Sequence, residues 1–297
     1  MKMLLKKLRK NQNYICRNSK KESLTGWMFI LPSLAGVSIF YLIPFADVVR
    51  RSVTEGMGAK FTGLRNYILL LENEAFLLAS ANTIKFMLLC IPLLLIFSLL
   101  FGVMIKSLNG KAGIYKTAFL VPLAVPVASI VLMWRFLFHE NGFFSMLAVN
   151  ILGNPIDFMN TNLAIYVLII SYLWKNTGYD MILWIAGLSG IPSSLYEAAS
   201  VDGAGRFKQF FYITLPNLRG MLFIIFILSV INSFKVFREA YLIGGNYPHT
   251  SMYMLQHLFN NWFVALDIEK LCAGAVIISI ATSALIIFFR NSIQGGK

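Results

Sequence analysis

Six long stretches without charged residues restrict what this chain can fold into. A helix rises about 1.5 Å per residue, so about 20 apolar residues can cross a hydrocarbon core of about 30 Å. A spanning helix also satisfies its own backbone hydrogen bonds where no water is present. We therefore predict an all-α membrane protein with six transmembrane helices. The apolar runs lie at residues 26–46, 86–105, 117–134, 158–174 with a continuation at 181–190, 220–234 and 271–289.

The fourth run is the least regular of the six. Lys175, Asn176, Gly178 and Asp180 interrupt it, so it can form either one helix or two half-spans. Around the runs we predict a basic tail at 1–25, a six-helix domain at 26–290 and a short tail at 291–297.

Composition agrees with a membrane location. Hydrophobic residues make up 58% of the chain and charged residues 13%, against about 25% charged residues in soluble domains. The net charge of +13 does not indicate nucleic acid, because the basic residues flank the apolar runs and form no single basic stripe. Cys16, Cys90 and Cys272 lack disulfide or metal-ligand spacing, so we expect packing roles for them.

The distribution of basic residues predicts the orientation. Cytoplasmic connections of membrane proteins carry an excess of Lys and Arg. One set of connections and tails holds 16 of these residues and the other set holds 5, which predicts that both termini are cytoplasmic. The basic set comprises 1–25, 106–116, 191–219 and 290–297, and the outer set comprises 47–83, 139–162 and 242–270.

All three histidines fall in the predicted outer connections. His139, His249 and His257 are far apart in the sequence, and scattered loop histidines are mostly surface residues. We predict no bound metal.

The cytoplasmic connection at 191–219 contains helix signals of its own. Ser194 and Glu197 have the spacing of a capping box, which predicts a helix start. Gly203 and Gly205 permit a sharp turn. An aromatic stretch follows, and we expect Pro216 to end its helix. The connection is thus predicted to be a short helix, a turn and a second helix.

This connection resembles the EAA loop of permeases from binding-protein-dependent ABC importers. The resemblance implies that the loop docks on an ATPase subunit and couples its closure to the spans. The matching residues are Glu197, Ala198, Ala199, Gly203, Ile213, Leu215 and Pro216. We expect Asp202, which lies among them, to be a further coupling residue.

A narrower resemblance extends over most of the chain from about residue 26. The runs FILPSLAGVSIFYLIPF, SYLWKNTGYDMILWIAGLSGIP and NSFKVF look like the first permease subunit of the carbohydrate-uptake subfamily. The outer residues Phe61, Gly63, Leu64, Asn66, Tyr67, Asn82 and Thr83 add to this likeness. One segment departs from it, because Gly244, Gly245, Asn246, Tyr247 and Pro248 stand where the family usually has Thr-x-Gly-Gly-Pro.

Charged residues inside the predicted spans need protein or water around them, because an ion at mid-membrane costs about 2.5 to 3.5 kcal/mol on insertion scales. Lys175 and Asp180 are five residues apart, on different helix faces, so each needs a separate partner. Lys235 and Glu239 are four apart and can pair, while Lys235 and Arg238 lie on nearly one face. Snorkelling of Lys235 to the outer surface is an equal alternative.

Polar residues near mid-membrane are candidates for substrate contact. A sugar presents hydroxyl groups at its rim and C–H groups on its faces, and transporter sites tend to lie at the midplane. Interhelical hydrogen bonding is the competing explanation for each residue alone. The candidate substrate-binding residues are Asn176, Tyr179, Asp180, Ser229, Asn232 and Ser233.

The chain has no G-x-x-x-x-G-K-[ST] loop and no constellation of nucleophile and base, so we do not expect an enzyme. We expect no cofactor in this chain, with ATP and Mg bound by a partner. The resemblance implies four kinds of partner besides membrane lipid: a second homologous permease, a dimer of ATP-binding subunits, an extracytoplasmic binding protein and a sugar. It also implies a bacterial cell membrane location.

Two other functions remain open at this point. EAA loops occur in importers of amino acids, peptides and phosphate, so the solute can differ. A stand-alone secondary transporter would use Lys175 and Asp180 as ion-coupling groups.

Overall fold

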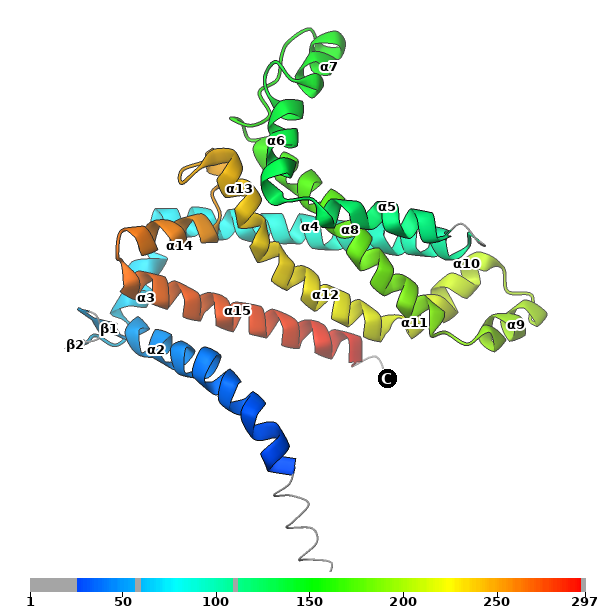
Figure 1. The fold of residues 1–297 in the computed structure, drawn as a ribbon, viewed down its shortest axis with the longest axis horizontal. Coiled ribbons are helices and arrows are strands. Elements are labelled where there is room, and N and C mark those ends of the chain that lie inside the picture. The colour runs from blue at the N-terminus through cyan, green and yellow to red at the C-terminus, as the bar shows by residue number, and fades with distance from the viewer. Residues whose placement is uncertain (1–25, 57–59, 109–111, 295–297) are drawn as a thin grey trace, which may run out of the picture. The chain divides into compact units, whose positions relative to one another are not determined.

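The computed structural model describes residues 26–56, 60–108 and 112–294, which are almost entirely helical (Figure 1). The chain divides into two compact units. The first comprises Met1–Tyr67 and Ile268–Val276, and the second comprises Ile68–Asp267 and Ile277–Lys297.

In the first unit, a helical segment of 27 residues runs from Gly26 to Ser52. It includes η1 (Ser38–Leu42), a π-helical turn, and α2 (Ile43–Ser52), which has a proline in its first turn. The wider turn before Pro44 accommodates a residue that has no N–H and whose ring crowds the preceding turn.

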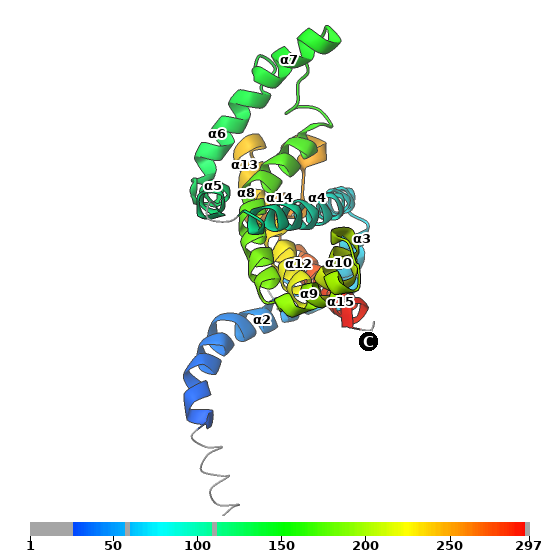
Figure 2. The same cartoon turned by 90° about the vertical axis from the view of Figure 1, so that its right-hand side faces the viewer.

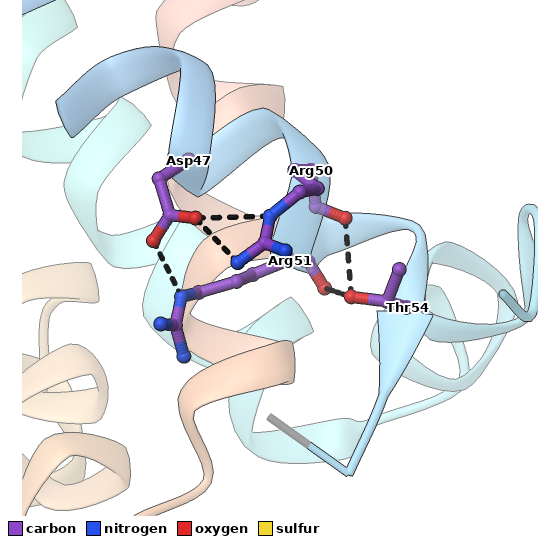
Figure 3. A network of polar contacts seen from close by, with 4 residues as sticks. All are labelled: Asp47, Arg50, Arg51 and Thr54. Carbon is purple, nitrogen blue, oxygen red and sulfur yellow. Dashed lines mark hydrogen bonds and ion pairs between the residues drawn. The ribbon is translucent and has the colours of Figure 1, made fainter. Parts of the chain in front are cut away.

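The end of α2 is held by a polar network (Figure 3). The Asp47 carboxylate accepts hydrogen bonds from Arg50 Nε at 3.0 Å and Arg51 Nε at 2.6 Å. The Thr54 hydroxyl donates to the main-chain oxygens of Arg50 and Arg51 at 3.2 and 3.4 Å. These bonds satisfy carbonyls that a helix end leaves without an intrahelical partner.

A small hairpin follows, made of β1 (Thr54–Glu55) and β2 (Lys60–Phe61). Asn66, on α3 (Arg65–Leu71), is buried and donates to the Ser52 and Thr54 oxygens at 3.0 and 2.9 Å. The Tyr67 hydroxyl lies 2.7 Å from Ser52 Oγ. Asn66 and Tyr67, both part of the family resemblance, thus fasten the chain after the hairpin onto the end of α2.

Two long helices form the core of the second unit. α4 (Glu74–Lys106) begins at Asn73, whose side chain accepts the Phe76 N–H at 3.0 Å, and α8 is Ala164–Ser189. Between them, Phe86 and Tyr172 meet edge to face at 5.4 Å, and Trp184 Nε1 donates to Ser98 Oγ at 3.0 Å. α8 is unbroken, so the half-span alternative for the fourth run is wrong.

A close approach fixes α5 (Ala112–Ala124) against α8. A methyl group at Gly178 would overlap the main-chain carbonyl of Phe119. Gly178 is therefore a packing requirement, because only hydrogen on its Cα leaves room for the α5 backbone.

The third apolar run does not form the straight span predicted at 117–134. α5 and α6 (Val127–Phe138) meet at a bend of 92° (Figures 1 and 2). The bend falls at Val125 and Pro126, because proline disfavours the helical conformation of the residue before it and cannot donate to the preceding turn. α7 (Phe143–Leu152) follows α6.

The remaining helices continue the chain. The connection contains α9 (Ser193–Val201), α10 (Arg206–Gln209), η2 (Phe210–Thr214) and α11 (Leu215–Asn217). A long helical segment comprises α12 (Arg219–Ser233), η3 (Phe234–Val236) and α13 (Phe237–Gly244). Last come η4 (Thr250–Met252), α14 (Leu255–Val264) and α15 (Ile268–Gln294).

Four helical segments within the described residues are long and apolar enough to cross a membrane, or five if the bent pair α5 and α6–α7 counts as one span. α8, with Lys175 and Asp180 in its interior, is not among them. The chain is therefore a multi-pass helical membrane protein, and six spans with cytoplasmic termini stay a prediction.

Candidate functional site: a membrane cavity and an exposed helix-turn-helix

The connection between α8 and α12 forms the predicted helix, turn and helix. Gly203, between α9 and α10, has a φ of +76°, which L side chains rarely adopt. A Cβ there would meet nothing within 4 Å, so the backbone angle alone demands glycine. Gly205 has an ordinary φ of −67°.

Two local predictions for this connection are wrong. α9 begins at Ser193 after Pro192, whose extended backbone starts the helix, and its N-cap has no side-chain hydrogen bond, so Ser194 and Glu197 form no capping box. Pro216 does not end the second helix. The π-helical turn η2 ends at Thr214, two residues before it, and accommodates the proline ring. The helix runs one residue past Pro216, to Asn217 at the end of α11.

Hydrogen bonds within the connection come from residues that the motif analysis missed. Tyr196 Oη and Thr214 Oγ1 lie 2.9 Å apart and join α9 to η2. Gln209 Nε2 donates to Ser200 Oγ and to the Ala204 oxygen, both at 2.9 Å. These bonds could have been predicted from polar residues that two paired short helices would turn toward each other.

The motif residues themselves are mostly turned outward. Glu197, Ala198, Asp202, Gly203 and Pro216 are exposed, and Ala199, Ile213 and Leu215 are half-buried. Around them lie large apolar side chains that are also open, with Val201 88%, Phe207 82% and Tyr212 76% exposed. Such a concentration of exposed apolar groups is typical of a protein interaction surface.

The connection and the ends of α4 and α8 together line a pocket of about 390 Å³. Lys106, at the end of α4, donates from Nζ to the Leu188 oxygen of α8 at 2.6 Å. Lys106 and Leu188 line the pocket together with Tyr196, Arg206 and Thr214. Residues of the connection and the ends of both core helices thus line one pocket.

A larger cavity of about 590 Å³ lies among the membrane helices of the second unit. The bend between α5 and α6 forms one wall, and α8, α12, η3 and α13 form the others. The bend, which the sequence did not predict as a break, thus shapes this cavity.

The cavity brings together three of the six candidate substrate residues, Asn176, Tyr179 and Asn232. The other three do not line it. Asp180, Ser229 and Ser233 are buried, and Ser229 Oγ donates to Asp180 Oδ2 at 3.1 Å across α8 and α12. Tyr172, which does line the cavity, donates from its hydroxyl to the Ser229 oxygen at 3.1 Å.

Charged residues form the rest of the cavity wall. Lys175 and Glu239 make an ion pair at 2.7 Å, with their side chains only 16% and 7% exposed. As expected, Lys175 and Asp180 have separate partners. The predicted pairing of Lys235 with Glu239 is wrong, because Lys235 lies in the 3-10 turn η3 and donates to Asn232 Oδ1 at 2.7 Å. The tighter winding removes the spacing that an α-helical pair needs.

Two polar residues that belong to the family resemblance, Asn82 and Thr83, have packing roles. Asn82 donates to the Thr250 and Tyr253 oxygens at 2.6 and 2.9 Å, and Thr83 Oγ1 accepts the Leu255 N–H at 3.1 Å. In the departing segment, Gly245 has a φ of +71°, and a Cβ at Gly244 would overlap Pro248. The glycines therefore make a tight turn without the family's usual motif.

His257 is not the surface residue that was predicted. It is 1% exposed on α14, where Nδ1 accepts the Met254 N–H at 3.2 Å and the ring meets Phe237 edge to face. Burial lowers the pKa of His257 to about 4, because the charged imidazolium would lose its hydration. The apolar residues spaced periodically along α14 could have predicted from the sequence that this helix has a buried face.

The described part of the chain holds no group of three His, Cys, Asp or Glu side chains placed to bind a metal ion. Cys90 and Cys272 are buried free thiols, and Cys16 lies outside the described residues.

The arrangement defines a class of protein: a helical membrane component with a polar cavity between its helices and an exposed helix-turn-helix outside them. The chain belongs to the family of binding-protein-dependent transport system inner membrane components, which it matches over residues 79–295. It is therefore an ABC importer permease by family.

Several known proteins resemble the whole chain. The trehalose/maltose transport system permease protein MalF of Thermococcus litoralis is 30% identical over 94% of this chain and 95% of its own length. The sn-glycerol-3-phosphate transport system permease protein UgpA of Yersinia enterocolitica is 27% identical over 89% and 92%. A bacterial ABC transporter involved in import of the acidic polysaccharide alginate contains a chain with the same fold, at a TM-score of 0.79, 18% identity, and coverage of 94% and 98%.

Proposed function

We propose that this chain is the membrane permease subunit of an ATP-driven importer for a sugar or oligosaccharide. The observation that carries the proposal is the cavity of about 590 Å³ bounded by α5, α6, α8, α12 and α13. Its amide, phenol and charged groups can exchange hydrogen bonds with sugar hydroxyls, and Tyr179 offers a flat face for C–H groups. The names of relatives such as the trehalose/maltose permease support the same solute class.

We assign substrate contact first to Asn176, Tyr179 and Asn232, which line the cavity. Asp180 and Ser229 would act indirectly, since their hydrogen bond joins α8 to α12. Ser233 donates to the Val230 oxygen within α12 and would stabilise that helix. A transport path needs such a rigid wall, because a substrate group is held only when its partners stay in place.

The exposed helix-turn-helix is proposed as the ATPase docking element. Glu197 is available to a basic residue of the partner, and Val201, Phe207 and Tyr212 can be buried in the contact. The pocket beneath it supplies the mechanical link, because Lys106 holds α4 to the end of α8. Closure of the ATPase would then move the two core helices.

The remaining assignments follow from the family. An extracytoplasmic binding protein would deliver the substrate, a second permease would complete the path, and two ATP-binding subunits would bind ATP and Mg. This chain would need no cofactor. Six spans with both termini in the cytoplasm of a bacterial cell agree with the basic connections at 106–116 and 191–219.

Reconstitution into proteoliposomes tests the proposal. The complete importer should take up saccharide only with ATP and binding protein, and this chain alone should transport nothing. Uptake by the isolated chain on an ion gradient would instead support a secondary transporter. ATP-driven uptake of amino acids, peptides or phosphate in place of saccharides would contradict the solute class.

A further inference from the structure

The cavity carries more positive than negative charge. Four ionisable basic or acidic side chains line it: Lys175, Lys235, Arg238 and Glu239. Lys175 and Glu239 neutralise each other through their 2.7 Å ion pair. The charges of Lys235 and Arg238 are left over, and within the described residues neither forms an ion pair.

Two cations of the cavity wall are three residues apart in one helical segment. Side chains at this spacing are neighbours on the surface of a helix. Lys235 lies in η3, and Arg238 follows three residues later in α13, with both side chains exposed in the isolated subunit. Two like charges at this spacing repel each other. An anion between them would remove that repulsion.

The geometry of the cations suits an oxyanion. Arg238 presents a planar guanidinium that can bind a carboxylate, sulfate or phosphate through two parallel hydrogen bonds. Lys235 Nζ is oriented by its 2.7 Å bond to Asn232 Oδ1 and keeps further N–H donors. Asn176 and Tyr179 line the same cavity and supply groups for hydroxyls.

We propose that this cavity selects saccharides that bear an anionic group, with Arg238 and Lys235 as the anion-binding residues. The inference rests on the proposed function and narrows its substrate class to acidic glycans. Neutral sugars would leave both cations without a counter-charge, whereas an anionic group would pair with them.

Uptake assays with the complete importer test this inference. The probes are uronate, sulfated and phosphorylated oligosaccharides, each paired with its neutral counterpart, for example a trigalacturonate and its carboxyl-reduced form. For the pairs that the binding protein delivers, wild type should take up the acidic member at least about tenfold more efficiently, the scale of one charge-assisted contact.

The variants should separate the cavity from the binding protein, because the same binding protein serves all of them. R238Q should lower acidic uptake about tenfold and neutral uptake less than about twofold, and K235Q should act in the same direction. R238K should recover part of the loss, since it restores charge without the planar fork. K85Q removes an exposed cation of α4 outside the cavity and should change neither rate.

Preference of wild type for the neutral members would overturn the inference. An equal loss of acidic and neutral uptake in R238Q and K235Q would also overturn it, and would indicate that the cations pair with the second permease or with lipid. Absence of ATP-driven uptake for every saccharide would instead refute the proposed function itself.

Discussion

The ion pair between Lys175 and Glu239 allows a quantitative test of how the cavity wall is held. The two side chains come from α8 and α13, 64 residues apart in sequence, and lie 2.7 Å apart with exposures of 16% and 7%. Breaking a buried pair by removing one partner typically costs about 3 to 5 kcal/mol, because the other charge stays unpaired. Replacing both partners by apolar residues of similar size is often close to neutral.

The surroundings make the two single variants unequal. E239L leaves Lys175 beside Lys235 and Arg238, so three cations share one cavity without a counter-charge. K175M leaves Glu239 in a cavity that still carries the positive charges of Lys235 and Arg238, which partly offset its own charge. We therefore expect a loss near 5 kcal/mol for E239L, near or below 3 kcal/mol for K175M, and about 1 kcal/mol for K175M/E239L.

Thermal unfolding of the purified importer, followed by tryptophan fluorescence, can rank these variants. Trp184 is 1% exposed in the α4–α8 core and reports unfolding of that core. A double variant as unstable as E239L would refute the reasoning, because it would show that the polar pair contributes stability of its own. Equal loss in both single variants would refute the role assigned to the neighbouring cations.

Four further predictions address the coupling element, helix packing, pH dependence and topology. Because Gly203 has a φ of +76°, G203P should impair coupling, and E197K should do so by reversing the charge offered to the ATPase. Substrate-stimulated ATP hydrolysis in proteoliposomes should fall about tenfold in both variants. The control G205A, at an ordinary φ, should match wild type. Wild-type coupling in assembled G203P and E197K complexes would contradict the docking role. G178A should destabilise the importer by about 1 to 3 kcal/mol, because the added methyl group overlaps the Phe119 carbonyl. The control G220A, whose Cβ would meet nothing within 4 Å, should not be destabilised. Thermal unfolding measures both, and equal stability of the two variants would disprove the close approach. His257 has a pKa of about 4 in the folded protein against 6.5 when unfolded. Its contribution to stability should therefore be complete above pH 6.5 and fall by about 3 kcal/mol as the pH drops to 4. A weaker dependence of stability on pH in H257N would assign the effect to His257, and an unchanged dependence would exclude it. A thiol in N246C should react with impermeant reagent from outside intact cells, and reaction from the inner side alone would rule out the predicted orientation.

The amino-acid sequence determined the class of fold and the place of the exposed helix-turn-helix. Apolar runs of about 20 residues leave few alternatives to membrane helices, because a backbone in lipid must satisfy its own hydrogen bonds. Gly203 in the connection between α8 and α12 was a local signal for the turn between its two short helices. The turn requires a left-handed backbone at this position, and Gly203 has a φ of +76° in the structure.

Departures from regular α-helix followed from local chemistry but were not foreseen. The 92° bend at Val125 and Pro126 and the π-helical turn before Pro216 both come from prolines inside helical stretches. Whether a proline ends a helix, bends it or is absorbed by a wider turn depends on the packing of neighbouring elements. The apolar pattern around it does not distinguish these outcomes.

Only the tertiary structure decided which polar residues share the cavity. The sequence suggested Lys235 as a partner for Glu239, but the 3-10 turn η3 separates them and Lys175, 64 residues earlier, takes that place. Asn176 and Asp180 look equally suited to substrate in the sequence, yet one lines the cavity and the other bonds to Ser229 behind it. Helical spacing specifies which residues share a face, whereas the rotation of each helix against its neighbours is set by packing across the whole unit.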